Sequence, residues 1–119
     1  MNLCSNEGNF KYETKEEIAE HIKRCSALLA DEIWISGENR YPCLTILING
    51  NYACVHYFEE EGVMWQSYGA HSEEIIFLAG GEEWSAPADT IISVENAILC
   101  IEEFFDSKKK PKCIEWQEL

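Results

Sequence analysis

The dipeptide Asn49-Gly50 separates two apolar runs, residues 43–48 and 51–58, and constrains the fold more than any other part of the chain. Asn-Gly readily supplies the two positive φ angles of a type I′ turn. The segment therefore predicts an antiparallel β-hairpin with a two-residue loop at Asn49-Gly50. In that register Thr45 lies opposite Cys54, and Cys43 lies opposite His56.

Further strands are predicted on both sides of this hairpin. Residues 32–36 alternate two isoleucines around a tryptophan, and aromatic and β-branched residues are frequent in 63–69 and 74–79. Residues 82–86 predict a short strand before Pro87, and residues 112–116 predict a last, peripheral strand. Together these runs favour an antiparallel meander sheet of about five to seven strands.

Two amphipathic helices are predicted, one before and one after the strands. Thr14 and Glu17 form a capping box, and apolar residues recur at helical spacing from Ile18 to about residue 30. Ser93 is expected to cap the second helix. Its predicted buried face comprises Val94, Ala97, Ile98, Ile101, Phe104 and Phe105. The predicted fold class is α+β, a single domain of residues 1–119 with both helices on one face of the sheet.

The negative charge of the chain is concentrated in its middle. Residues 41–107 contain twelve acids and no lysine or arginine, a charge of −12, so the flanks contribute only −1 to the total of −13. Folding does not need such an excess, because like charges repel, whereas steering of a basic partner can use it. An acidic chain is also a poor direct binder of nucleic acid, since phosphate contacts need clustered bases.

The chain has six cysteines and contains no apolar run of about 18 residues. Its first residues contain no basic region followed by an apolar segment. We therefore expect a soluble cytoplasmic protein with free thiols and no membrane segment. The Asn-Gly and Gly-Gly dipeptides are interpreted as turns. The residues after Gly80-Gly81 do not have the spacing of a phosphate-binding loop.

The central acids fall mainly at predicted turns and strand edges, close to aromatic residues. They are interpreted either as solvated loop charge or as one negative surface with aromatic anchors, which is how many tight interfaces are composed. Trp34 and Trp116 are expected to serve mainly the core. The predicted partner-binding residues are Glu59, Glu60, Glu61, Trp65, Tyr68, Glu73, Glu74, Glu82, Glu83, Trp84 and Asp89.

Cys43, Cys54 and His56 support an alternative function, because the hairpin places all three on one face. Two thiolates and an imidazole suit zinc, but a closed structural site needs a fourth ligand, and none occurs at metal-like spacing. A cysteine nucleophile with His56 as base is the best enzymatic interpretation, yet no oxyanion nest accompanies it. We expect no catalytic residue, metal or cofactor; the alternative is a small cytosolic ligand- or zinc-binding domain.

The C-terminal part of the chain contains Ser93-Val94-Glu95-Asn96-Ala97, Ile101 and Phe104-Phe105, followed by the ending Pro111-x-x-Ile114-x-Trp116. In these motifs it resembles the Imm1 family of bacterial immunity proteins, and the resemblance extends over about residues 44–117. The family often has a glycine directly after the helix, where this chain has Lys108. A non-glycine residue in a left-handed cap costs about 1 kcal/mol, so the helix is expected to end differently here.

The resemblance implies a non-enzymatic protein that neutralises a cognate toxin domain made by the same bacterium, in that family often a nucleic-acid deaminase or nuclease. Such a toxin grips nucleic acid with a basic cleft, which an acidic protein can occupy. The resemblance assigns no role to individual acids. The residues listed above therefore rest on the charge pattern alone.

Overall fold

The computed structural model describes residues 1–5, 8–27, 30–69, 71, 73–79 and 82–118. Two helices, α1 (Lys15–Ala27) and α2 (Val94–Ser107), and a short 3-10 helix, η1 (Ala88–Thr90), accompany the strands. The strands are β1 (Asn2–Ser5), β2 (Gly8–Lys11), β3 (Ala30–Ser36), β4 (Cys43–Asn49), β5 (Tyr52–Glu60), β6 (Val63–Tyr68), β7 (Ile75–Ala79), β8 (Glu82–Ala86), β9 (Ile92–Ser93) and β10 (Glu115–Glu118).

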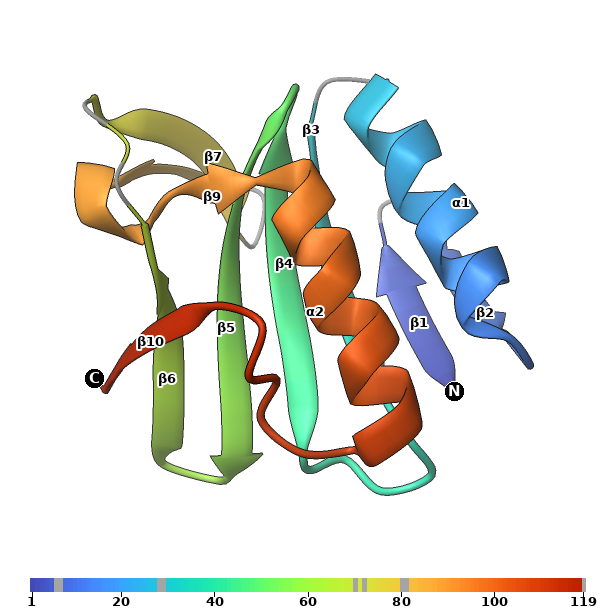
Figure 1. Ribbon diagram of the computed structural model, residues 1–119. Helices are drawn as coiled ribbons and strands as arrows, with labels where there is room; N and C mark the ends of the chain where they lie inside the picture. Colours follow the sequence, from blue (N-terminus) through green and yellow to red (C-terminus); the bar gives the residue numbers. More distant parts are fainter. Residues whose placement is uncertain (6–7, 28–29, 70, 72, 80–81, 119) are drawn as a thin grey trace.

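The main sheet is antiparallel, in the order β10-β6-β5-β4-β3-β1-β2, with β9 paired to β5 (Figure 1). The α+β class and the central meander β3-β4-β5-β6 are confirmed. The last strand is an edge strand as predicted, and it pairs with β6. No helix within the described residues is both long and apolar enough to cross a membrane.

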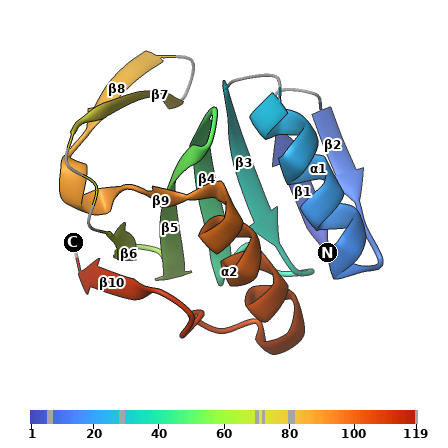
Figure 2. The same cartoon turned by 45° about the horizontal axis from the view of Figure 1, so that its top comes forward.

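Both helices cover the same face of this sheet, where they lie side by side (Figures 1 and 2). Their apolar stripes meet the inward residues of β3, β4 and β5. Three α2 residues, Ala97, Ile101 and Phe104, are fully buried, while Ile98 and Phe105 only border the core. The predicted helix stripe is confirmed for Ile18, Ile22 and Cys25; Leu28 and Leu29 lie outside the described residues.

The helix ends carry the capping contacts that the sequence predicts, with one difference. Thr14 Oγ1 accepts from Glu17 N–H (3.3 Å), and Ser93 Oγ accepts from Asn96 N–H (3.1 Å). Lys108 nevertheless adopts the left-handed conformation (φ 53°), so the expectation of a different helix end was wrong.

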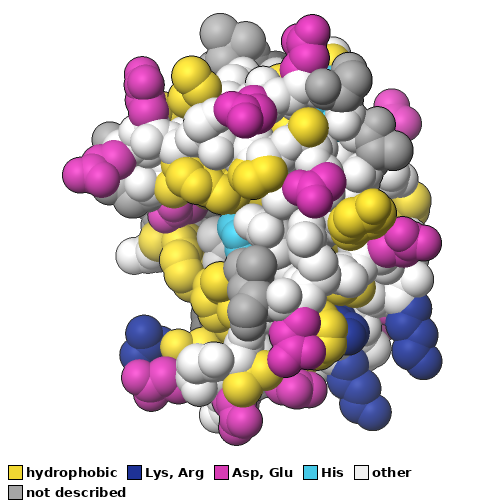
Figure 3. All heavy atoms as spheres, turned by 90° about the vertical axis from the view of Figure 1, so that its left-hand side faces the viewer, with side chains coloured by type: hydrophobic (Ala, Val, Ile, Leu, Met, Phe, Trp, Pro, Cys, Tyr) yellow, Lys and Arg dark blue, Asp and Glu magenta, His cyan; other side chains and the backbone are white. Residues whose placement is uncertain are grey.

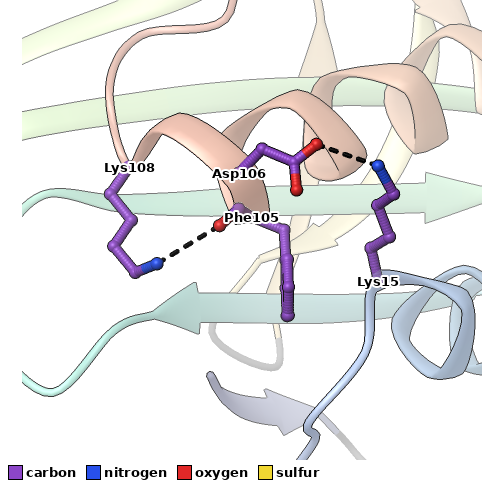
Figure 4. A network of polar contacts seen from close by, with 4 residues as sticks. All are labelled: Lys15, Phe105, Asp106 and Lys108. Carbon is purple, nitrogen blue, oxygen red and sulfur yellow. Dashed lines mark hydrogen bonds and ion pairs between the residues drawn. The ribbon is translucent and has the colours of Figure 1, made fainter.

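Two lysines hold this end of α2 in place, which offsets the cost of a side chain in the left-handed region. The Lys108 N–H donates to Phe104 O (2.7 Å) and its Nζ donates to Phe105 O (3.3 Å) (Figure 4). Lys15 Nζ, at the start of α1, forms an ion pair with Asp106 Oδ2 (2.9 Å). The two helices are thus joined where α1 begins and α2 ends.

Strands β7 and β8 do not extend the meander but form a separate two-stranded sheet. They pack on the face of the main sheet that the helices leave free, where Leu47, Cys54, Phe77, Ala86 and Ile91 make a second, smaller core. Gly69 is where the chain leaves β6: a Cβ there would lie 2.1 Å from Ile91 O, so only glycine permits this approach. The prediction that 74–79 continues the meander was wrong.

The β4–β5 hairpin is confirmed, but its register is shifted by two residues. Asn49 pairs with Tyr52, Thr45 with His56, and Cys43 with Phe58, so the loop residues are Gly50 and Asn51. Gly50 has the positive φ (59°) as the first loop residue, the position that type II′ turns give to glycine. A shift of two residues keeps the same side chains on each face. The face that carries Leu44, Ile46, Ile48, Ala53 and Val55 lies in the main core.

Candidate partner-binding surface

The eight predicted acidic contact residues are all exposed, but they lie at two places. Glu59 and Glu60 are the last residues of β5 and Glu61 begins the β5–β6 turn, at the lower end of the sheet in Figure 1. The others border β7, β8 and η1 in the upper half, near Tyr68 at the far end of β6. The five residue steps from Val63 to Tyr68 separate the two places by about 17 Å along the strand.

The upper half carries Glu73 and Glu74 before β7, Glu82 and Glu83 at the start of β8, and Asp89 in η1. Glu74 Oε2 accepts a hydrogen bond from Ser85 Oγ (2.8 Å). Two ion pairs, Lys15–Asp106 and Lys23–Glu20, join described residues, and neither involves an acid of the upper half. The carboxylates of the upper half therefore have no basic partner within the described chain.

The outer face of the β7–β8 hairpin adds two apolar residues that the sequence analysis missed. Phe77 is buried against the main sheet, so its neighbours Ile76 and Leu78 point outward and are 52% and 39% exposed. Leu78 pairs with Glu83, and Ile76 pairs with Ser85. We call Glu74, Ile76, Leu78 and Glu83 the outer hairpin face. The signal that could have revealed it is the run of five apolar residues 75–79, because a strand turns successive side chains to opposite faces and so leaves some of them outside.

The outer hairpin face is held firmly on the main sheet. Asn49 Nδ2, in the β4–β5 turn, donates to Ile76 O (2.7 Å). Gly69 N–H donates to Asp89 O (2.8 Å), and the buried Ser67 hydroxyl donates to Thr90 O (2.6 Å). The acids and the exposed aliphatic pair thus have a defined position relative to the sheet.

Beside this region lies a groove of about 470 Å³ between β6, β9 and the segment that leads into β10. Tyr68, which is 47% exposed, forms one wall, and the Tyr52 and His71 rings lie 4.7 Å apart in another. Glu115 places one further carboxylate on the rim. The groove gives the upper half a concave, aromatic neighbour.

The lower end differs from the upper half because basic residues approach it. Lys110 Nζ lies 3.6 Å from the centroid of the Trp65 ring, and Trp65 is two residues beyond Val63, the pairing partner of Glu60. In the side view of Figure 3, lysine and arginine side chains gather in the lower part of the molecule, while the charged side chains seen in the upper part are carboxylates. The charge around Glu59, Glu60 and Glu61 is therefore mixed.

The predicted aromatic anchors do not form one group. Trp65 is half-buried against the main core, whereas Trp84 is half-buried against the second core, 6.0 Å from the His56 ring. Trp116 borders the main core and its indole N–H donates to Pro111 O (2.7 Å), as its predicted role requires. Trp34, expected mainly in the core, is instead 42% exposed and stacks on Phe58 (5.7 Å).

Cys43, Cys54 and His56 share a face, as predicted, but Cys43 pairs with Phe58 and Cys54 with Leu47. The described residues contain no group of three or more histidine, cysteine, aspartate or glutamate side chains placed to hold a metal. Burial raises the pKa of both thiols and lowers the pKa of His56 to about 4. Protonated thiols beside a weakly basic imidazole do not favour thiolate chemistry.

These features define a small α+β domain with an exposed, acidic and partly apolar surface. The family model for immunity protein Imm1 matches residues 6–118. The chain therefore belongs to the Imm1 immunity protein family, and the match includes the N-terminal helix, which the sequence resemblance did not reach. Membership implies a toxin partner and suggests a non-enzymatic inhibitor. No curated protein matches the chain.

Proposed function

We propose that this protein neutralises a cognate bacterial toxin domain that acts on nucleic acid, a deaminase or a nuclease, by stoichiometric occlusion of its basic cleft. The observation that carries the proposal is the set of eight exposed carboxylates between residues 59 and 89, none of which has an ion-pair partner among the described residues. Unpaired like charges do not stabilise a fold, because they repel one another, whereas they attract a cationic partner.

Electrostatics gives these acids a mechanism. A domain that binds nucleic acid must present clustered lysine and arginine side chains, and an acidic protein competes for them. Long-range attraction accelerates capture, which protects a cell that makes the toxin. The partner-binding residues remain those proposed from the sequence, and the upper half is the stronger part because its acids form no ion pair with a described residue.

Burial of apolar surface would supply the affinity that charge alone does not. The outer hairpin face offers Ile76 and Leu78 inside a rim of carboxylates, an arrangement like the apolar centre and polar rim of protein interfaces. Tyr68 on β6 and the half-buried Trp84, which pairs with Phe77 on the inner side of the hairpin, are the proposed aromatic contacts. The contact centre is therefore the outer hairpin face rather than the β5–β6 turn.

Co-expression tests the function directly. The probe is the C-terminal domain of a secreted protein encoded beside this gene, produced with and without this chain. We expect toxicity only without it, and a one-to-one complex on co-purification. Survival of cells that produce the domain alone would contradict the proposal, as would toxicity that persists when both proteins are present and folded.

Leu78→Lys tests the contact centre. Because Leu78 is exposed, the variant should fold, and loss of a central apolar contact with added repulsion should cost about 2 kcal/mol or more of binding free energy. Leu99→Lys is the matched control, since Leu99 is similarly exposed but lies on α2. Calorimetric titration should show loss of affinity for Leu78→Lys only; equal affinities of the two variants would exclude the outer hairpin face.

A further inference from the structure

Two cysteines far apart in the sequence lie in contact near the C-terminus. Cys113 Sγ is 3.4 Å from Cys100 Sγ. Cys100 is buried within α2, whereas Cys113 is exposed in the segment between α2 and β10. The pair thus combines one thiol that a reagent in solution reaches with a second thiol directly behind it.

The surroundings allow these two sulfurs to come closer. A disulfide requires a sulfur–sulfur distance of about 2.05 Å, so the pair must approach by about 1.4 Å. Cys113 lies outside any helix or strand, in a segment of bends that precedes β10. Such a segment adjusts its backbone more easily than the interior of a helix does.

We propose that Cys100 and Cys113 form a dithiol site that a low-molecular-weight disulfide such as oxidised glutathione converts to an intramolecular disulfide. The inference concerns the chain alone and does not depend on the proposed toxin. It assigns a chemical role to two of the six cysteines, which the binding surface does not use.

The exchange proceeds in two steps. The Cys113 thiolate attacks one sulfur of oxidised glutathione, which breaks that disulfide and releases one glutathione thiolate. The Cys100 thiolate then attacks the Cys113 sulfur of the mixed disulfide and releases the second glutathione. The protein loses two electrons and two protons, and one oxidised glutathione becomes two reduced molecules.

Burial raises the pKa of both thiols, and for Cys100 the neighbouring Cys113 sulfur adds to the rise. Since only the thiolate attacks, the exchange should be slow near neutral pH and should accelerate as the pH rises.

A bridge at this position would fix the chain that leads into β10. Cys113, Ile114 and Glu115 line the groove beside Tyr68, and the bridge would tie them to α2. Closing a loop of this length restricts the unfolded chain, so the oxidised protein should melt about 5 °C or more above the reduced protein.

The test exposes the folded protein to oxidised glutathione near pH 8.5, the ordinary pKa of a free cysteine. Free thiols are then blocked with a maleimide, and intact mass and peptide mapping follow. In wild type, Cys100 and Cys113 should together lose two hydrogen atoms, carry no glutathione and yield a Cys100–Cys113 linked peptide. Cys4→Ser removes the other exposed thiol and should give the same linked peptide.

Two further variants make the outcome decisive. Cys100→Ala should retain glutathione on Cys113, and Cys113→Ser should form no bridge and show no change in melting temperature after treatment. Glutathione that persists on Cys113 in wild type would overturn the proposal. So would uptake of glutathione by Cys4 while Cys100 and Cys113 stay reduced, or an oxidised protein that melts no higher than the reduced one.

Discussion

The two faces of the main sheet carry cores of different size. On the helix face, α1 and α2 bury seventeen residues in one continuous cluster that reaches from Leu3 to Phe104. On the opposite face the β7–β8 hairpin covers the sheet only in part and buries a cluster of five residues. The acids of residues 73–89 all lie with this second, smaller layer.

The helix face serves packing and stability, whereas we assign partner recognition to the hairpin face. The helix face uses nearly all of its large apolar residues for packing, and its ion pair joins the two helices to each other. The hairpin face leaves Trp34, Ile76 and Leu78 exposed, and the carboxylates of residues 73–89 have no ion-pair partner among the described residues. A surface of that kind is costly for a monomer and useful to a binding protein.

Truncating one phenylalanine in each core should give the largest contrast. Phe104→Ala should cost about 4 kcal/mol of unfolding free energy, because Phe104 is fully buried in the main core and its ring packs edge-on against Tyr57. Phe77→Ala should cost less and should expose mainly β7 and β8 amides to hydrogen exchange. Equal loss of protection across β3–β5 in the Phe77 variant would show that the two layers are one cooperative unit.

His56 should make the hairpin face sensitive to acid. Burial lowers its pKa from 6.5 to about 4, and Gln66 Nε2 lies 2.9 Å from its Nε2, where an amide N–H is donated to a neutral ring. Between these two pH values the unfolded chain binds the extra proton, so stability falls as the pH drops through this window and levels off below it.

The predicted loss at His56 is about 3 kcal/mol across that window. Urea titrations between pH 7 and pH 4 measure it against His56→Gln, in which the imidazole contribution is absent. Other carboxylates titrate in both proteins and cancel in the difference. Identical pH profiles for the two proteins would mean that His56 takes up its proton in the folded state as easily as in the unfolded state.

Trp116→Ala should destabilise the protein by about 2 kcal/mol, less than a fully buried tryptophan would, since Trp116 is only half-buried. Its ring lies 6.3 Å from Tyr57, and it anchors β10 through Pro111 O. Trp34→Ala is the control, because Trp34 is exposed on the opposite face. Chemical denaturation should rank Trp116→Ala well below Trp34→Ala in stability; the reverse order would refute the packing role.

The sequence predicted the elements whose signals are local. The Thr14 capping box, the Ser93 cap and the alternation around Trp34 depend on neighbouring residues, and each is found in place. The strands β1 and β2 were missed because their polar residues carry no such pattern. Pairing of Leu3 with Phe10 and with Ile35 builds them from contacts distant in sequence.

Partner choice between strands was beyond local patterns. The two-residue period of a strand determines which side chains of residues 75–79 share a face. This period is the same whether the strand continues a meander or packs across a sheet. The position of the strand is decided by contacts distant in sequence, such as the close approach of Gly69 to Ile91. The clustering of acids along the chain likewise identified residues that are exposed in the structure. It could not show that Glu59, Glu60 and Glu61 lie apart from the acids of the upper half.

Under the proposed function, the acids of the upper half steer the toxin domain more strongly than the acids at the lower end do. Glu73→Lys/Glu82→Lys/Glu83→Lys and Glu59→Lys/Glu60→Lys/Glu61→Lys change the net charge equally, and neither set includes Glu74, which hydrogen-bonds Ser85. Stopped-flow association at low and high salt measures each variant. We predict about a tenfold slower association at low salt for the upper triple, a smaller effect for the lower triple, and convergence at high salt. Equal rates for the two triples, or a larger effect of the lower one, would contradict the account.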